Sequence, residues 1–190
     1  MINMSIRKTA NTPMERLVAS ADNALKTLLV STPEAARANP AEAPEANLAE
    51  EQRKHAAGLM RVNHAGEVAA QGLYQGHALV ARSEGMQAHM QHAAEEEYDH
   101  LAWCDQRLKE LGSRPSLLGP AWYAGAYAIG ALSALAGDRW GLGFIEETEK
   151  QVAEHLDDHL KRLPSQDQRS RQILATMKAE EEAHGKDAHN

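Results

Sequence analysis

Glu67 is the only acidic residue between Glu51 and Glu84, and it lies in a run, 60–81, that otherwise reads as a closely packed helix. A Glu-x-x-His motif follows it, and the same order of a Glu and then Glu-x-x-His occurs a second time at nearly the same interval. This doubled pattern is typical of a di-metal carboxylate site inside a helix bundle. The candidate metal ligands, which would also be the catalytic residues, are Glu67, Glu97, His100, Glu149, Glu181 and His184.

The residues around these glutamates indicate which way their side chains point. Glu97 lies on one helical stripe with Met86, Met90, Ala93, Leu101, Cys104, Leu108 and Leu111. Glu149 is in line with Ile145, Val152, Leu156 and Leu163, and Glu181 is in line with Leu174 and Met177. Buried carboxylates left ionised and unpaired would each cost several kcal/mol. The pattern therefore predicts two divalent cations that neutralise them.

Helix geometry assigns roles within this set. Residues at i and i+3 project from one side of a helix, so each Glu-x-x-His supplies a bridging carboxylate and a terminal imidazole. Oxygen and nitrogen ligands without thiolate suit iron or manganese better than a structural zinc. Taken singly, each glutamate of the runs 95–97 and 180–182 is also compatible with a solvated face, and only the coincidence of six positions favours the metal site.

Three further histidines, His64, His155 and His159, lie near these positions in the sequence. Each is either a partner that orients a metal ligand or an ordinary surface or core histidine. Their spacing alone favours the ordinary alternative.

Composition limits the class of protein. A chain of 190 residues fits one domain, and its single cysteine, Cys104, excludes an intrachain disulfide and a four-cysteine zinc site. No apolar run of signal-peptide length occurs near the start, so a reducing, cytosolic context is expected. The net charge is −7 and no basic stripe is present, so nucleic acid is not an expected partner.

The hydrophobic pattern predicts an all-α protein. Thr12-Pro13-Met14-Glu15 is a helix start, and an amphipathic helix follows it. Residues 31–46 are rich in Pro, Ala and Glu and are expected to form a linker. We therefore divide the chain into an N-terminal helix with its linker, 1–46, and a catalytic domain, 47–190. Four long helices are expected in that domain, at 48–82, 86–111, 138–163 and 166–187.

The expected turns pair these helices into two hairpins, each with a Glu at roughly the same height on both arms. The second hairpin is nearly symmetric, and the first is lopsided by a few residues. The stretch 112–137 must then connect the hairpins, as the long crossover of a ferritin-like four-helix bundle does. Within it, 115–137 is uncharged and apolar. If this segment crossed a bilayer, the first three candidate ligands would lie on the opposite side from the last three, so the metal site and a membrane span exclude each other.

Residues 59–67, Leu-Met-Arg-Val-Asn-His-Ala-Gly-Glu, with Glu97-x-x-His100 and the stretch 149–155, closely resemble the demethoxyubiquinone hydroxylases of ubiquinone biosynthesis. The resemblance runs from about Asn47 to the C-terminus. It implies a di-iron monooxygenase that hydroxylates the ring of 2-polyprenyl-3-methyl-6-methoxy-1,4-benzoquinol with O2. It also implies two Fe2+ ions bridged by Glu97 and Glu181, all six candidate ligands as the ligand set, and His155 close to the metals.

The resemblance implies partners as well. A polyprenyl quinol resides in the bilayer, so we expect peripheral attachment to the cytoplasmic side of the cell membrane, with the segment 115–137 and its Trp122, Tyr123 and Tyr127 at the membrane face. The alternative is a crossover helix buried against the bundle or in a homo-oligomer. No flavin or dinucleotide motif is present, so electrons must come from a partner, with other ubiquinone-biosynthesis proteins as candidates, or through the quinone itself, and NADH is the expected external reductant.

Two other functions are compatible with the ligand pattern. One is a di-manganese catalase, and the other is ferritin-like iron storage with ferroxidase activity. Storage predicts large hollow oligomers with a mineral core, whereas a hydroxylase predicts a pair of irons per chain. A rubrerythrin-type peroxidase would need additional cysteine pairs, which one cysteine cannot supply.

Overall fold

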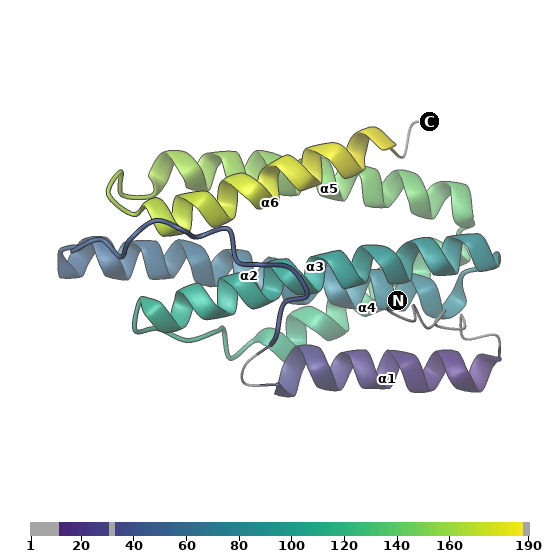
Figure 1. The fold of residues 1–190 in the computed structure, drawn as a ribbon. Coiled ribbons are helices and arrows are strands. Elements are labelled where there is room, and N and C mark those ends of the chain that lie inside the picture. The colour runs from purple at the N-terminus through teal and green to yellow at the C-terminus, as the bar shows by residue number, and fades with distance from the viewer. Residues whose placement is uncertain (1–11, 31–32, 188–190) are drawn as a thin grey trace, which may run out of the picture.

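The computed structural model describes residues 12–30 and 33–187, and the regular structure within them is entirely helical. The predicted all-α class is therefore confirmed (Figure 1). The four helices expected in the second part of the chain all form, and each end lies within two residues of its predicted position. The helices are α1 (Pro13–Leu29), α2 (Glu50–Val80), α3 (Glu84–Glu110), α4 (Gly119–Leu135), α5 (Asp138–Arg162) and α6 (Gln168–Asp187).

Local capping explains why two of these helices begin where they do. At the start of α1, Thr12 Oγ1 accepts from the Glu15 backbone N–H at 3.2 Å, and Glu15 Oε2 accepts from the Thr12 N–H at 2.9 Å. This reciprocal pair is the predicted capping box. At the start of α3, Ser83 Oγ accepts from the Met86 N–H at 3.1 Å. The turn between α2 and α3 thus lies at 81–83, slightly before the gap between the helices predicted at 48–82 and 86–111.

The four long helices form two antiparallel hairpins, α2 with α3 and α5 with α6, that pack against each other. Cys104 on α3 contacts Met177 on α6, and Asn63 on α2 contacts His159 on α5. This arrangement is the ferritin-like bundle that the sequence predicted. Figure 1 shows α6 and α1 on opposite sides of it.

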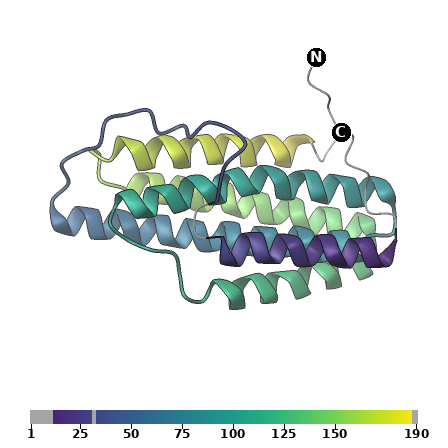
Figure 2. The same cartoon turned by 60° about the horizontal axis from the view of Figure 1, so that its bottom comes forward.

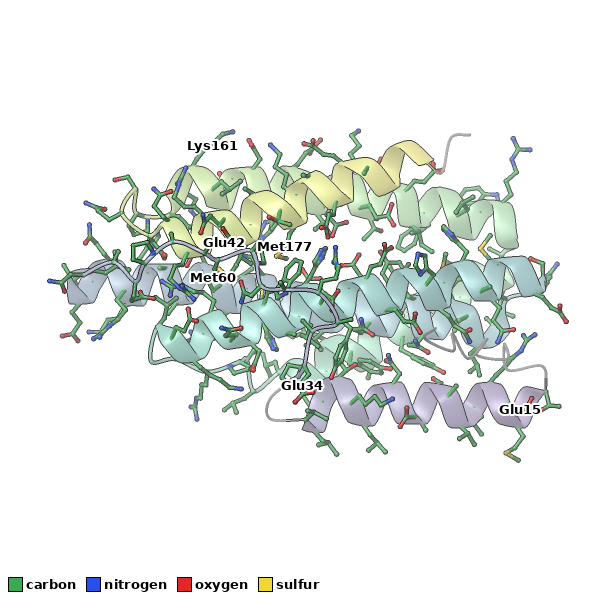
Figure 3. All side chains as sticks on the ribbon, in the orientation of Figure 1. Glu15, Glu34, Glu42, Met60, Lys161 and Met177 are labelled. Atoms are coloured by element: carbon green, nitrogen blue, oxygen red, sulfur yellow. The ribbon has the colours of Figure 1, made fainter. Side chains whose placement is uncertain are left out.

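Of the apolar clusters in the core, the two largest lie at different heights along the bundle. Met60 and Met177 lie in the first, between α2 and α6 (Figure 3). The second contains Leu73, Met90 and Ile145. Along α2, Glu67 lies between the residues of these two clusters. The candidate ligands therefore come from the middle of the bundle, where packing on both sides excludes water.

The crossover segment forms α4, which runs beside α2 over most of its length. A Cβ atom at Gly72 or Gly76 of α2 would overlap the backbone carbonyl oxygen of Tyr123 or Tyr127, and one at Gly130 would overlap that of Leu73. The glycines of both helices thus permit backbone contact between them. Among the described residues, no helix is both long and apolar enough to cross a membrane.

Tyr123 and Tyr127 differ from expectation, because they do not lie on the exposed face of α4. Tyr123 is buried, and its hydroxyl donates to Asn23 Oδ1 of α1 at 3.1 Å. The Tyr127 hydroxyl accepts from Ser20 Oγ of the same helix at 2.9 Å. Both hydroxyls therefore hold α1 to α4, and the two helices lie side by side in Figure 2. Trp122 is exposed, as the membrane hypothesis requires.

The residues expected to form a linker pack against the bundle. Residues 33–49 run across α3 and α6 in an extended path (Figure 1). Arg107, fully buried on α3, binds Glu45 from this segment and Asp167 near the start of α6. The Arg107 guanidinium therefore ties the segment to both helices. The division of the chain at residue 46 stays a prediction.

Candidate metal centre

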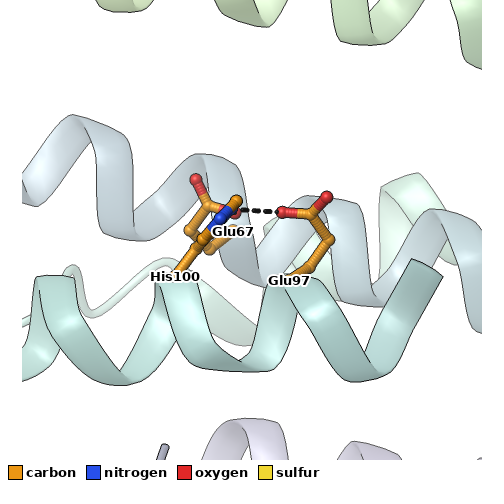
Figure 4. A group of neighbouring side chains, drawn as sticks. All are labelled: Glu67, Glu97 and His100. Carbon is orange, nitrogen blue, oxygen red and sulfur yellow. Dashed lines mark hydrogen bonds and ion pairs between the residues drawn. The ribbon is translucent and has the colours of Figure 1, made fainter. Parts of the chain in front are cut away.

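Glu67, Glu97 and His100 meet inside the bundle, where α2 faces α3 (Figure 4). Each offers one ligand atom, and these atoms all lie within 4.8 Å of one another. The three residues are buried, with 4 %, 1 % and 0 % of their surface exposed. Two carboxylates and an imidazole at this spacing form a group that is able to hold a metal ion.

The helical repeat explains how one ring nitrogen reaches carboxylates on two helices. Glu97 and His100 are one turn apart on the same face of α3. His100 Nδ1 lies 2.8 Å from Glu97 Oε2 and 3.9 Å from Glu67 Oε2 on α2. The Glu-x-x-His spacing therefore points Nδ1 at the position where a metal would bind.

Two more predicted ligands come to this position from the second hairpin. Glu181 on α6 is buried, and its Oε1 lies 3.7 Å from His100 Nδ1. Glu149 on α5 is also buried, and the Tyr74 hydroxyl donates to its Oε1 at 3.3 Å. The charge of Glu149 acts on Glu181 as well. The structure thus brings together five of the six predicted residues, one or more from each of the four helices.

His184 is the sixth predicted ligand. Its backbone belongs to α6, one turn beyond Glu181, but its side chain lies outside the described residues. The i, i+3 relation between Glu181 and His184 repeats the one between Glu97 and His100. Its metal-binding role, like that of the other five, stays a prediction.

The electrostatics of the group favour a bound cation. Burial first, and then the charge of Glu97, raises the pKa of Glu67 well above its usual range. The same two causes raise the pKa of Glu181 to about 10. Burial opposes the charged form of His100, but the Glu97 charge and a hydrogen bond to Glu180 raise its pKa overall. Without a cation, the carboxylates cannot all be ionised together, and metal ions would replace the protons that they hold.

The donor atoms of the group suit particular metals. Carboxylate oxygens and an imidazole nitrogen meet here, whereas the thiol of Cys104 contacts Met177 Sδ at 3.9 Å. Oxygen and nitrogen donors without thiolate fit iron or manganese, and two divalent ions balance four carboxylates. The residues present therefore fit a di-metal centre.

Glu180, which its sequence context made compatible with a solvated face, contacts this group through His100. Its Oε2 lies 2.8 Å from Nε2 of His100, the ring nitrogen that faces away from Glu97. The hydrogen bonds from His100 and Arg37 lower the pKa of Glu180 to about 2, against the opposing effect of its partial burial. The sequence did contain one signal that Glu180 lies near the inward face of its helix. A residue next to Glu181 lies about 100° around the helix, beside the inward face and within reach of a neighbouring helix.

The other three histidines have different surroundings. His64 is buried, and burial lowers its pKa to about 4. His159 Nδ1 lies 2.9 Å from Asn63 Oδ1, and burial also lowers its pKa to about 4. His64 and His159 are therefore neutral core residues. His155, which the resemblance placed close to the metals, is exposed, and its ring centroid lies 3.9 Å from that of His159.

A groove of about 860 Å³ opens between α5 and α6 and reaches Glu181. Its described lining is mostly charged, so it favours water and ions over an apolar chain. The charged lining residues are Glu146, Glu147, Lys150, Glu154, Asp157, Lys161, Lys178, Glu181 and Glu182.

Known proteins are similar to this chain over most of its length. The family model described as "Ubiquinone biosynthesis protein COQ7" matches residues 54–190. The 3-demethoxyubiquinol 3-hydroxylase of Xanthomonas oryzae pv. oryzae (strain PXO99A) is 58 % identical over 179 residues, which are 94 % of this chain and 82 % of that protein. The proteins of the same name from Xanthomonas campestris pv. campestris (strain 8004) and Polynucleobacter necessarius subsp. necessarius (strain STIR1) are 57 % identical over 175 residues and 53 % identical over 180 residues. These two alignments cover 92 % and 94 % of this chain and 80 % and 86 % of the respective relatives. The chain therefore belongs to the COQ7 family of ubiquinone biosynthesis proteins.

Proposed function

We propose that this chain is a di-iron monooxygenase that hydroxylates the ring of a demethoxyubiquinol with O2. The observation that carries the proposal is the convergence of buried carboxylates and an imidazole from four helices. The bundle alone would not indicate a reaction, since many functions use it. The names of the relatives, 3-demethoxyubiquinol 3-hydroxylase, support the choice of substrate and reaction.

Two iron ions are the proposed cofactor. Glu97 and Glu181 would bridge them, and His100 and His184 would be terminal ligands. Glu67 and Glu149 would complete the set. Bound ferrous iron would supply the site for O2 and would pass to it the electrons that an external reductant replaces.

The protein contributes orientation and exclusion of water. The Tyr74 hydroxyl, itself buried, donates to Glu149 and limits the positions that this carboxylate can take. Glu180 accepts from His100 Nε2 and so fixes which ring nitrogen is free for the metal. The apolar clusters above and below the group exclude water along the bundle, which leaves the charged groove at Glu181 as the route for water and ions.

The substrate's polyprenyl tail requires contact with a bilayer. We define the apolar face as the exposed apolar residues of two adjacent helices, α1 and α4 (Figure 2). An apolar patch of this kind marks a membrane or protein interaction site. We propose that it docks peripherally on the cytoplasmic side of the cell membrane, where the quinol resides. Its members are Met14, Leu17, Val18, Leu25 and Leu29 of α1 and Trp122, Ile129, Leu132 and Leu135 of α4.

The electrons must come from outside the chain. The sequence contains no dinucleotide-binding glycine motif, so NADH is proposed as an external reductant that acts through the quinone or through another ubiquinone-biosynthesis protein. A homo-oligomer is compatible with the same apolar face.

Lipid analysis of cells that lack this protein tests the proposal. Mass spectrometry should show that the demethoxy quinone accumulates, and that the wild-type chain restores ubiquinone. Glu97→Gln should not restore it, because it removes a proposed bridge. Glu95→Gln, an exposed change on the same helix, should restore it fully. Absence of the demethoxy intermediate, or full rescue by Glu97→Gln, would contradict the proposal.

A further inference from the structure

The segment between α1 and α2 is attached to the helices that carry the metal group. We call residues 33–48 the strap. The Ala36 N–H donates to Asp99 Oδ1 of α3 at 2.6 Å, and the Ala43 N–H donates to Gln172 Oε1 of α6 at 3.0 Å. The strap is therefore held to α3 and α6 by hydrogen bonds from its backbone.

Arg37 extends from the strap toward the metal group. Its Nε donates to Asp99 Oδ2 at 2.6 Å, and its Nη1 donates to Glu180 Oε1 at 2.8 Å. The guanidinium also lies over the Trp103 ring, 4.9 Å from the centroid. Two carboxylates and an aromatic face thus fix the guanidinium, although 42 % of the side chain is exposed.

Two of these contacts of Arg37 are also contacts of His100. Glu180 accepts from Arg37 with one oxygen and lies 2.8 Å from His100 Nε2 with the other. The Trp103 ring packs against the imidazole, with 5.4 Å between the centroids. With Nε2 held by Glu180, the ring presents Nδ1 to Glu97. The orientation of the imidazole therefore depends on groups that Arg37 holds in place.

We propose that Arg37 is a positioning residue for the metal centre, acting through Glu180 and Trp103 to orient His100. This inference rests on the proposed ligand set. It makes the strap, which precedes the residues 54–190 matched by the family model, a part of the site. Loss of a partner of a metal-bound histidine typically weakens metal binding by about 10- to 100-fold. Arg37 acts one contact further out, so we expect a loss of about tenfold.

Arg37 could instead do no more than anchor the strap, and Asn39 provides the matched control. Asn39 Nδ2 donates to Gln106 Oε1 of α3 at 2.9 Å. This bond joins the same strap to the same helix, but it reaches Gln106 and not Glu180. An anchoring role predicts equal effects of the two substitutions, whereas a positioning role predicts an effect of Arg37 alone.

Anaerobic titration of the purified full-length protein with Fe2+, against a chelator of known affinity, measures the effect. Wild type should bind two ions, and Arg37→Gln should bind one of them about tenfold more weakly. Asn39→Ala should stay within about twofold of wild type. Arg37→Lys should restore part of the affinity, because lysine keeps the charge but lacks the planar fork that spans two carboxylates.

Two further measurements separate orientation from folding. With Co2+ in place of Fe2+, the visible absorption bands report ligand geometry and should change in Arg37→Gln but not in Asn39→Ala. Circular dichroism should show the same helix content in all variants. Adding Arg37→Gln to Glu180→Gln should cost less affinity than Arg37→Gln costs alone, since the two changes share the Glu180 contact and only the Trp103 contact remains to be lost.

Wild-type affinity and an unchanged Co2+ spectrum in Arg37→Gln would overturn the inference, as would an equal loss in Asn39→Ala. If wild type binds an iron pair and Arg37→Gln behaves like it, only this inference fails. If wild type binds no iron pair, the proposed ligand set fails as well.

Discussion

Glu181 and Glu67 couple proton binding to stability at the level of single residues. The pKa of Glu181 is about 10 in the folded, metal-free chain against an ordinary value of 4.5, and that of Glu67 is raised in the same direction. The folded state therefore keeps protons that the unfolded state releases. This contribution to stability is complete below about pH 4.5 and is lost as the pH rises toward about 10.

The midpoint of thermal unfolding of the metal-free protein should consequently fall by about 5 °C between about pH 7 and about pH 9. His64 and His159, whose pKa values are lowered to about 4, are neutral in the folded state over this window, and because their unfolded forms are mostly deprotonated above about pH 7 they add only a small slope of opposite sign. Glu181→Gln should reduce the fall, and Fe2+ should abolish it, because the metal holds the carboxylates ionised. A midpoint that stays constant in metal-free wild type would contradict these protonation states.

For single residues, the sequence predicted those contacts of the site that form within one helix. The spacing of Glu97 and His100 is local, and helix geometry converts it directly into a shared face. Glu180 and Arg37 could not be predicted in this way. Their contacts depend on the rotation of α6 against α3 and on the path of the strap, and neither follows from the spacing of nearby residues.

Close contact between α2 and α4 gives a prediction at the scale of elements. A Cβ at position 76 would overlap the Tyr127 carbonyl oxygen, so Gly76→Ala must push the two helices apart. We expect it to lower the free energy of unfolding by about 1–3 kcal/mol. Gly58→Ala is the control, since it lies in the same helix and a Cβ there meets nothing within 4 Å. It should be neutral or stabilising by up to about 1 kcal/mol, because alanine favours helix. Denaturant unfolding measures both variants, and equal effects would exclude the proposed backbone contact.

The elements themselves were largely predictable. Apolar periodicity and capping residues act within one helix, so α2, α3, α5 and α6 begin and end close to the expected residues. The side of α4 that faces the bundle was not predictable in the same way. Aromatic residues favour a membrane interface and a core alike. Only the positions of Asn23 and Ser20 on α1 explain why Tyr123 and Tyr127 point inward.

For the whole molecule, the apolar face predicts attachment to a bilayer. Leu132→Lys together with Leu135→Lys should weaken co-sedimentation with phospholipid vesicles by about tenfold, since both leucines are more than half exposed on α4. Val62→Lys on α2 replaces another half-exposed aliphatic residue away from this face and should leave binding unchanged. Vesicle binding that survives the double change would rule out docking through α4.

The overall arrangement followed from the sequence because each hairpin turn lies near the midpoint between two candidate ligands, which sets them at one height. The ordered path of the strap could not be predicted from the sequence. Its Pro- and Ala-rich composition is that of a free linker, and its order comes from partners distant in sequence, such as Arg107 with Glu45.

Reaction of the purified, iron-loaded protein with demethoxyubiquinol and ¹⁸O2 tests the central claim most directly. We predict that one ¹⁸O atom enters the quinol ring, and that Glu149→Ala lowers both iron content and hydroxylation, the latter by at least about a hundredfold. Glu147→Ala, an exposed carboxylate on the same helix, should retain both. Oxygen derived from water, or full hydroxylation by Glu149→Ala, would contradict a di-iron monooxygenase built from these carboxylates.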